Sequence, residues 1–537
     1  MLAGLVPIEE IYMKRRCLWT AFVIAVILSG AALAQSEIDP EFGKRILNAG
    51  HAGYAQDMVV QPDNKVVMVS GCFHFEDGSY TVCMVRVNPN GTLDGSFVGS
   101  ENRVPGIVRT KSLGVCNCSG EMFGIARQID GKLVVAGVVT QTGVGQGLGL
   151  SRYNVDGSID TSFGTNGSVF TNISPENDHG RKVAIQPDGK IVVVGYSITG
   201  EQPYPTAQQF LARYTSGGVL DSSFGTGGIF KANLPGSRTH GESIAIQTDG
   251  KILAGGAAVG PEQGYLITRL NPDGTLDTSW SGDGYRIIAN SVSGIYTDSG
   301  IRSLTVQSDG RITALGTLNH IFRLNPDGAF DTTFAGVGFR AALPDSYTSE
   351  NAYGMIVTAG GRITVVGQSR PPGLGYQYEV ARFLSNGAED TSFSGDGYLS
   401  IDIGAGNDGG RSIAVDSQGR LVVAGINAIQ SCSLCNPWVP SSFSVTRLIV
   451  PTVLIGISGR ATRPDGQPVI NAILTTLDNT GTVRFARTNP FGYYRFLNLP
   501  PAQSYTISVR AKGRLFADRT VVAGDDVANV DFISQEP

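Results

Sequence analysis

The sequence predicts an all-β chain, a seven-bladed β-propeller followed by a small β-sandwich. Three observations lead to this prediction: a turn between two apolar runs recurs about every 60 residues, an Asp-x-x-aromatic signature follows most copies of that turn, and the pattern changes after Val453. The 537 residues include 71 glycines and only 16% charged residues, a composition typical of many turns and much buried strand.

Residues 1–34 have the order of a secretory signal peptide. A basic triplet at residues 14–16 precedes an apolar run at residues 18–28 and the small residues at positions 32–34. We expect cleavage after Ala34 and a true start at Met13. The alternative is an uncut signal anchor, but the apolar run is shorter than the about 20 residues of a bilayer span. We therefore expect a secreted or cell-surface protein with no membrane span after cleavage.

The repeated element is clearest in Ala184-Ile-Gln-Pro-Asp-Gly-Lys-Ile-Val-Val-Val-Gly195, where Pro187-Asp188-Gly189 separates two apolar runs. Pro presets φ at the first corner of the turn, and Gly supplies the positive φ that a tight hairpin requires. The equivalent positions define seven units: Pro62-Asp63-Asn64, Asp130-Gly131, Asp188-Gly189, Asp249-Gly250, Asp309-Gly310, Gly360-Gly361 and Gln418-Gly419.

A second turn introduces a short fourth strand in each unit, as in Arg269-Leu-Asn-Pro-Asp-Gly-Thr-Leu-Asp-Thr-Ser-Trp280. One aromatic side chain per unit suits packing between neighbouring blades. The signature occurs at Asp94 to Phe97, Asp160 to Phe163, Asp221 to Phe224, Asp277 to Trp280, Asp331 to Phe334 and Asp390 to Phe393.

The seventh unit lacks this signature after Arg447, but Ile38-Asp39-Pro-Glu-Phe42-Gly43 matches it at the other end of the chain. A ring whose last blade takes a strand from the N-terminus leaves no exposed sheet edge. We therefore expect Phe42 to pack in the blade that contains residues 445–448. Two smaller packed β-domains are the alternative.

The repeats at residues 38–450, exemplified by Gln186-Pro-Asp-Gly-Lys-Ile-Val-Val-Val-Gly195 and Arg152-Tyr-Asn-Val-Asp-Gly-Ser-Ile-Asp-Thr-Ser-Phe-Gly164, resemble the delta-60 repeat family of secreted bacterial proteins. This resemblance implies a propeller domain at residues 35–450 and no particular activity. The turns of units 1, 6 and 7 depart from the pattern, because Asn64 replaces Gly in the first and the other two lack Asp.

Residues 451–537 alternate apolar and polar residues between Gly and Pro turns, as in Thr488-Asn-Pro-Phe-Gly-Tyr-Tyr-Arg-Phe-Leu-Asn-Leu-Pro500. This pattern predicts a small β-sandwich. The segment is similar to the carboxypeptidase regulatory-like domain, which implies a prealbumin-like fold and a non-catalytic module, and some related sandwiches bind sugars. The usual Gly before the last strand's Tyr is absent at residues 501–504.

The sequence contains no motif typical of nucleic-acid binding, of zinc or serine hydrolases, or of phosphate binding. The net charge of −5, with no Lys/Arg run beyond the N-terminus, argues against nucleic acid as a partner. None of the five His residues has Glu three positions later, and no His-Glu-x-x-His, Gly-x-Ser-x-Gly or phosphate-loop motif occurs. Calcium at the Asp-Gly turns is an alternative to plain turn formation, which we favour because the carboxylates are few. We expect no cofactor.

Six cysteines follow the signal peptide, and an even number in an exported protein favours disulfides. If Asp77-Gly78 forms a two-residue hairpin turn, Cys72 and Cys83 lie opposite each other, within disulfide range. Cys432 and Cys435 form a weaker local pair. The spacing of Cys116 and Cys118, and of the 432/435 pair, also leaves a zinc site open.

The candidate ligand-binding residues precede the first strands of several units: Asp178, His179, His240, Asp298, Glu350 and Asp408. We expect them near the mouth of the central channel, where the four carboxylates form an acidic ring for a cation or polar ligand. The alternative is that they form turns and cap strands. Loop aromatics offer a second candidate, for sugar faces: Tyr204, Tyr376, Tyr378 and Trp438.

These features favour a non-enzymatic binding or scaffold protein that holds an extracellular glycan or surface protein on the propeller. Its loops at residues 196–209 and 426–442 vary while the scaffold repeats, which is how binding surfaces are built. The alternative is a glycan hydrolase or lyase, which requires two channel carboxyl groups about 5 to 10 Å apart in a deep cleft.

Overall fold

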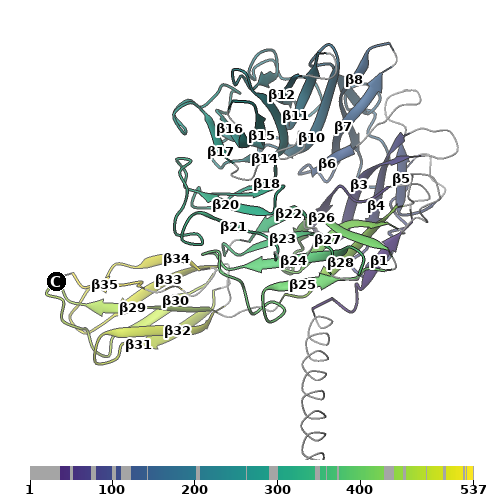
Figure 1. The fold of residues 1–537 in the computed structure, drawn as a ribbon. Helices are drawn as coiled ribbons and strands as arrows, with labels where there is room; N and C mark the ends of the chain where they lie inside the picture. Colours follow the sequence, from purple (N-terminus) through teal and green to yellow (C-terminus); the bar gives the residue numbers. More distant parts are fainter. Residues whose placement is uncertain are drawn as a thin grey trace, which may run out of the picture.

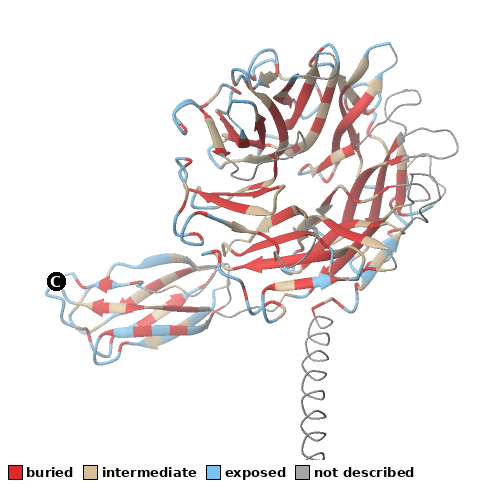
Figure 2. Ribbon diagram, in the orientation of Figure 1, coloured by how far each residue is buried: buried red, intermediate tan, exposed pale blue. Residues whose placement is uncertain are grey.

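The computed structural model describes most of the chain from residue 37 onward. The described residues are 37–48, 53–73, 80–99, 104–110, 122–141, 143–200, 206–261, 263–289, 300–344, 351–358, 360–371, 374–404, 406–428, 441–450, 455–478, 481–499, 503–523, 527 and 529–535. The expected signal peptide, Cys116, Cys118, Cys432 and Cys435 lie outside them. Every named element is a β-strand, and the strands carry most of the buried residues (Figures 1 and 2).

Strands β1–β28 pair into seven four-stranded antiparallel blades within the described residues (Figure 1). Blades 1 to 4 comprise β2 (Asp57–Val60), β3 (Val66–Phe73), β4 (Tyr80–Val87) and β5 (Ile107–Thr110); β6 (Met122–Arg127), β7 (Leu133–Gln141), β8 (Gly145–Tyr153) and β9 (Ser168–Thr171); β10 (Asn177–Ile185), β11 (Ile191–Thr199), β12 (Thr206–Tyr214) and β13 (Ile229–Lys231); and β14 (Arg238–Ile246), β15 (Ile252–Val259), β16 (Gly264–Leu270) and β17 (Tyr285–Ala289).

Blades 5 and 6 follow the same order along the chain, and blade 7 takes its fourth strand from the N-terminus. They comprise β18 (Ile301–Val306), β19 (Ile312–Gly316), β20 (His320–Leu324) and β21 (Phe339–Ala341); β22 (Asn351–Val357), β23 (Ile363–Ser369), β24 (Gln377–Phe383) and β25 (Tyr398–Ile401); and β26 (Asn407–Val415), β27 (Leu421–Ala428), β28 (Ser441–Leu448) and β1 (Lys44–Leu47). A single bridge, Asn177 to Gln146, links blades 2 and 3.

The last blade is completed by the N-terminal strand, as the displaced signature predicts. Strand β1 pairs antiparallel with β28, and Ile38 forms a bridge with Leu448. Phe42 is fully buried in one core cluster with Val445 and Val422. The closure of the ring by residues 38–47 is therefore confirmed.

The Asp-x-x-aromatic signature joins neighbouring blades. In blade 3, Arg213 donates from Nε to Oδ2 of Asp221 at 2.9 Å, and its Cζ lies 4.6 Å from the ring centroid of Phe224. The same Arg donates to the carbonyl of Pro272 in blade 4. The equivalent Arg–Asp pairs are Arg86–Asp94, Arg152–Asp160, Arg269–Asp277, Arg323–Asp331, Arg382–Asp390 and Arg447–Asp39.

The aromatic side chain packs against the next blade at a glycine in its second turn. A Cβ on Gly218 would lie 2.8 Å from the ring of Phe163, and a Cβ on Gly274 would lie 2.6 Å from that of Phe224. Both glycines also have positive φ. The glycine of the second turn therefore serves two purposes, since it lets the chain reverse and it admits the aromatic ring of the preceding blade.

Strands β29–β35 form the C-terminal β-sandwich. One sheet contains β29 (Ile455–Thr462), β32 (Tyr493–Leu499) and β35 (Phe532–Ile533); the other contains β30 (Ile473–Leu477), β31 (Val483–Arg487), β33 (Gln503–Arg510) and β34 (Arg519–Ala523). Ile457, Leu474, Phe496, Tyr505 and Phe532 pack between the sheets. The expected sandwich is confirmed.

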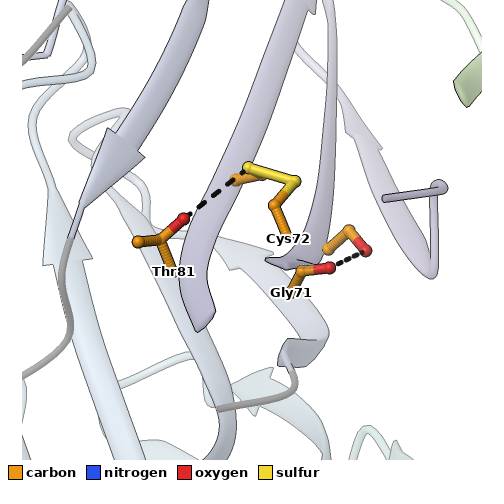
Figure 3. Close-up of a disulfide and its surroundings, with 5 residues drawn as sticks. Gly71, Cys72 and Thr81 are labelled. Carbon is orange, nitrogen blue, oxygen red and sulfur yellow. Dashed lines mark hydrogen bonds between the residues drawn. A yellow bond between two sulfur atoms is a disulfide. The ribbon is translucent and has the colours of Figure 1, made fainter. Parts of the chain in front are cut away.

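Cys72 and Cys83 form the predicted disulfide, with Cα atoms 5.7 Å apart (Figure 3). The register behind the prediction is wrong, however, because Cys72 lies opposite Thr81 and Ser70 lies opposite Cys83. The pairing differs by two residues from that of a two-residue turn at positions 77 and 78, so the disulfide joins diagonal neighbours. Thr81 Oγ1 lies 4.0 Å from Cys83 Sγ.

No helix in the described part of the chain is long and apolar enough to cross a membrane.

Candidate functional site

A cavity of about 550 Å³ occupies the centre of the propeller and is lined by the first strand of every blade. Six of these strands carry a β-bulge, at which the register against the second strand shifts by one residue. The extra residue lines the cavity, and the six are Phe123, Arg181, Glu242, Arg302, Tyr353 and Arg411. Gln56, just before β2, occupies the corresponding place in blade 1.

The bulge depends on a glycine in the second strand. The residue before each bulge pairs with Gly137, Gly195, Gly256, Gly316, Gly367 or Gly425. A Cβ on Gly195 would lie 2.0 Å from the carbonyl oxygen of His179, and one on Gly256 would lie 1.7 Å from that of His240. The glycine that recurs in six of the second strands was therefore the signal in the sequence for these channel residues, because glycine within a strand often marks a bulge.

Lys182 and Asp57 form one ion pair across the cavity. Lys182 Nζ lies 2.7 Å from Asp57 Oδ1. Asp57 also accepts hydrogen bonds from the backbone N–H of Ile125 at 3.0 Å and from Ser412 Oγ at 3.2 Å. This carboxylate therefore links blades 1, 2, 3 and 7 around the channel.

Arg181 and Glu242 form a second pair, with 3.5 Å between Nε and Oε1. The guanidinium Cζ of Arg181 lies 4.3 Å from the ring centroid of Phe123, and Nη2 donates to the hydroxyl of Tyr196 at 2.9 Å. Arg181 is thus held by contacts from three directions, and both carboxylates of the cavity lie against cations.

Arg302 and Arg411 lie on either side in sequence of Tyr353 and contact the same ring. Their Cζ atoms lie 5.4 and 3.6 Å from its centroid, and Arg411 also lies 5.7 Å from the ring of Tyr54. No ion pair or hydrogen bond to either guanidinium group occurs within the described residues. The lining therefore holds four cationic side chains against two carboxylates, in a chain whose net charge is −5.

The two described carboxylates of the expected acidic ring, Asp178 and Asp408, are buried and hydrogen-bonded. Asp178 is fully buried and accepts hydrogen bonds from the backbone N–H groups of Ile173 and Ser174. Asp408 is 1% exposed and accepts from Ile403 N and from Asn427 Nδ2. Burial raises the pKa of Asp408, against these hydrogen bonds.

Both carboxylates cap the chain segment that enters their own blade, as the alternative interpretation of the sequence expects, and neither is among the residues that line the cavity. Asp298 and Glu350, the other two members of the expected ring, lie outside the described residues.

His179 and His240 flank the ring of Tyr196. His179 stacks on it with 4.9 Å between centroids, and His240 is tilted at 4.5 Å. Burial, followed by the charge of Arg181, lowers the pKa of His179 to about 4, against the opposing charge of Asp178. His179 is therefore neutral at physiological pH. Tyr196 also accepts a hydrogen bond from Arg181, which lines the cavity. The two His residues therefore hold Tyr196, and through it Arg181, in place.

The expected sugar-binding aromatics are only partly described. Tyr378 is fully buried, its hydroxyl lies 2.6 Å from Ser444 Oγ, and burial raises its pKa, so it is a core residue and not an exposed ring. The ring centroid of Tyr376 lies 5.8 Å from the Cζ of Arg370. Tyr204 and Trp438 lie outside the described residues.

The Asp-Gly turns use their carboxylates locally. Asp188 accepts from the backbone N–H of Lys190, and Asp273 from that of Thr275. In the described part of the chain, no group of three or more His, Cys, Asp or Glu side chains is placed to hold a metal ion.

Comparison with known families matches two parts of the chain. A family model described as a domain of unknown function (DUF5122) β-propeller matches residues 61–97, 128–163, 186–224, 247–279 and 307–334, and the carboxypeptidase regulatory-like domain matches residues 456–534. Five segments of the propeller are thus similar to DUF5122 repeats. Each DUF5122 match begins at or beside the first turn and ends at or next to the aromatic of the second signature, so the matched segments include the residues that join the blades. Blades 6 and 7 lie outside the matched ranges.

Individual proteins are only distantly similar. No curated protein matches the sequence. A protein of unknown function from Dyadobacter fermentans shares 10% identity with a TM-score of 0.41, and covers 76% of this chain and 98% of its own. YCF48 from Cyanidioschyzon merolae shares 10% identity with a TM-score of 0.40, over 75% of this chain and 98% of its own.

Proposed function

We propose that this protein is a secreted, non-enzymatic binding protein of the delta-60 repeat type, whose propeller holds an extracellular glycan or surface protein. One observation carries the proposal. The scaffold repeats from blade to blade, but the bulged residue that lines the central cavity is Phe, Arg, Glu, Arg, Tyr or Arg. Variable side chains on a uniform, rigid frame are the usual construction of a binding site.

Export is supported by the disulfide and by the signal-like segment of the sequence. Disulfides persist in oxidising compartments and are rare in reducing ones. The Cys72–Cys83 bond is buried in the core of blade 1, where both cysteines are fully inaccessible. Such a bond is of use to a protein that folds outside the cytosol.

A binding role is favoured over glycan hydrolysis by the state of the cavity's carboxylates. A hydrolase requires one carboxyl group as acid and a second as base or nucleophile. Asp57 accepts three partners, including Lys182 at 2.7 Å, and Glu242 lies against Arg181. Carboxylates occupied in this way are suited to holding the cavity in shape.

The proposal is tested by applying the full mature chain to immobilised extracellular polysaccharides and to surface-protein extracts. Phe123→Ala alters the cavity wall, and Phe485→Ala removes a Phe that is 72% exposed on the sandwich. We expect binding to weaken in the first variant and to persist in the second. Loss in the second variant alone would assign the activity to the sandwich, and release of reducing ends from a polysaccharide would establish the hydrolase alternative.

A further inference from the structure

Two arginines in the central cavity have no anionic partner within the described residues. Arg302 and Arg411 come from blades 5 and 7, and both lie against Tyr353 of blade 6. We propose that the cavity binds an oxyanion, the carboxylate, sulfate or phosphate group of a small organic ligand, through these two guanidinium groups. The inference rests on the proposed binding role of the propeller and specifies the ligand's chemistry.

The contact with Tyr353 leaves the donors of the guanidinium groups available. Arg411 Cζ lies 3.6 Å from the ring centroid, a distance typical of face-to-face stacking. A guanidinium stacked by its face directs its N–H groups outward in its own plane. A planar fork of this kind matches the two oxygens of a carboxylate or the oxygens of a phosphate. Tyr353 therefore orients the Arg411 guanidinium group and leaves its N–H groups available for hydrogen bonds to a ligand.

The other charges of the cavity are already balanced. Lys182 pairs with Asp57, and Arg181 pairs with Glu242, within the same lining. Arg302 and Arg411 are both partly buried, and two cations held near one ring repel each other more strongly in a confined cavity than in open water. An oxyanion between the two guanidinium groups converts this repulsion into two attractions.

The dimensions of the cavity favour a small ligand. Its volume of about 550 Å³ lies within the range of pockets that hold small molecules. The neutral part of such a ligand would contact the remaining lining, which includes Tyr54, Met58, Leu304, Met355 and Ile413. A sugar acid combines an oxyanion with a compact neutral body, and inorganic phosphate supplies the oxyanion alone.

The test is calorimetric titration of the full mature chain with sodium glucuronate, inorganic phosphate and, as a neutral control, methyl glucoside. The variants are Arg302→Gln and Arg411→Gln, with Arg463→Gln, an exposed position on the sandwich, as the matched control. We expect an anion to bind the wild type and the control alike, and each cavity variant to bind about tenfold more weakly or worse, because hydrogen bonds to charged groups are strong.

Arg302→Lys and Arg411→Lys keep the charge and should retain part of the affinity, and added NaCl should weaken binding to the wild type, which tests the site even if a Gln variant is unstable. Tighter binding of glucuronate assigns the site to sugar acids, and equal binding of phosphate assigns it to the oxyanion alone. The proposal is overturned if neither anion binds, if both Gln variants bind as the wild type does, or if methyl glucoside binds as tightly as glucuronate.

The two proposals fail in different ways. A neutral glycan that binds the propeller regardless of Arg302 and Arg411 would end this inference and leave the proposed function standing. If anion binding depends on both arginines but the whole chain binds no extracellular glycan or surface protein, the anion site stands and the proposed function fails.

Discussion

Arg447 donates a hydrogen bond from Nε to Oδ2 of Asp39 at 2.8 Å, although 408 residues separate the two in sequence. Both side chains are buried, and the Cζ of Arg447 lies 4.9 Å from the ring centroid of Phe42. The equivalent Arg–Asp pair occurs inside each of the other six blades between residues only eight positions apart. The N-terminal segment thus supplies blade 7 with its missing signature and closes the ring.

Asp39→Ala should destabilise the propeller by about 3–5 kcal/mol, because it removes the carboxylate 2.7 Å from the buried Arg447 and leaves only the more distant Asp416, at 3.9 Å. Urea denaturation of the wild type and the variant gives the difference in the free energy of unfolding. Asp465→Ala, at an exposed turn of the sandwich, is the control and should change stability little. If both variants lose the same free energy of unfolding, the Asp39–Arg447 closure does not contribute specially to the stability of the propeller.

Reduction of the Cys72–Cys83 disulfide should lower the stability of blade 1 by about 3 kcal/mol, since the bond restricts the unfolded chain over an 11-residue separation. The melting temperature is measured with and without reductant. A Cys72→Ser/Cys83→Ser double variant controls for the remaining cysteines. Without reductant it should already melt at the temperature of the wild-type protein treated with reductant. Peptide mapping that finds both thiols free in the exported protein would contradict the assignment.

Gly218→Ala should destabilise the protein by about 2–4 kcal/mol, through its positive φ and through overlap of the new Cβ with Phe163. Gly282→Ala is the matched control in the propeller. Its φ is +95°, but a Cβ there would meet nothing within 4 Å. The control should be destabilised only by the cost of placing Ala at a positive φ, about 1–2 kcal/mol. A cost no larger at Gly218 than at Gly282 would show that the Phe163 contact is dispensable.

His179 makes stability depend on pH in the mildly acidic range. Its pKa is lowered to about 4 in the folded protein from the ordinary 6.5, so the unfolded chain binds a proton that the folded chain does not. This contribution to stability is fully present above pH 6.5 and is lost as the pH falls through 4. Melting temperatures recorded from pH 7.5 to 3.5 should therefore decline across this window.

His179→Gln should flatten the decline of the melting temperature between pH 6.5 and 4. Superimposable pH profiles for the wild type and the variant, or an imidazole that titrates near 6.5 by NMR in the folded protein, would refute this account of His179.

The repeat pattern predicted the blades because turn chemistry is local. Pro187, Asp188 and Gly189 specify their hairpin without help from the rest of the fold. The displaced signature around Phe42 was equally legible, since a missing piece at one end matched an extra piece at the other. The Cys72–Cys83 pair was found with the wrong register, because the length of a hairpin turn does not follow from one Asp-Gly pair.

The candidate site was harder to predict because a β-bulge changes which residues face inward. Alternation of side chains along a strand holds only until an extra residue is inserted. Arg181, Arg302 and Arg411 consequently line the cavity, whereas Asp178 turns back to the amides of Ile173 and Ser174. The glycines opposite the bulges, such as Gly195, carried this information in the sequence.

Hydrogen–deuterium exchange of the full mature chain, with and without its bound partner, tests the central claim most directly. If the propeller cavity is the binding site, peptides that contain Arg302, Tyr353 and Arg411 should become protected, and peptides from β29 to β35 should not change. Protection confined to the sandwich strands, with none in the first strands of the blades, would contradict the account.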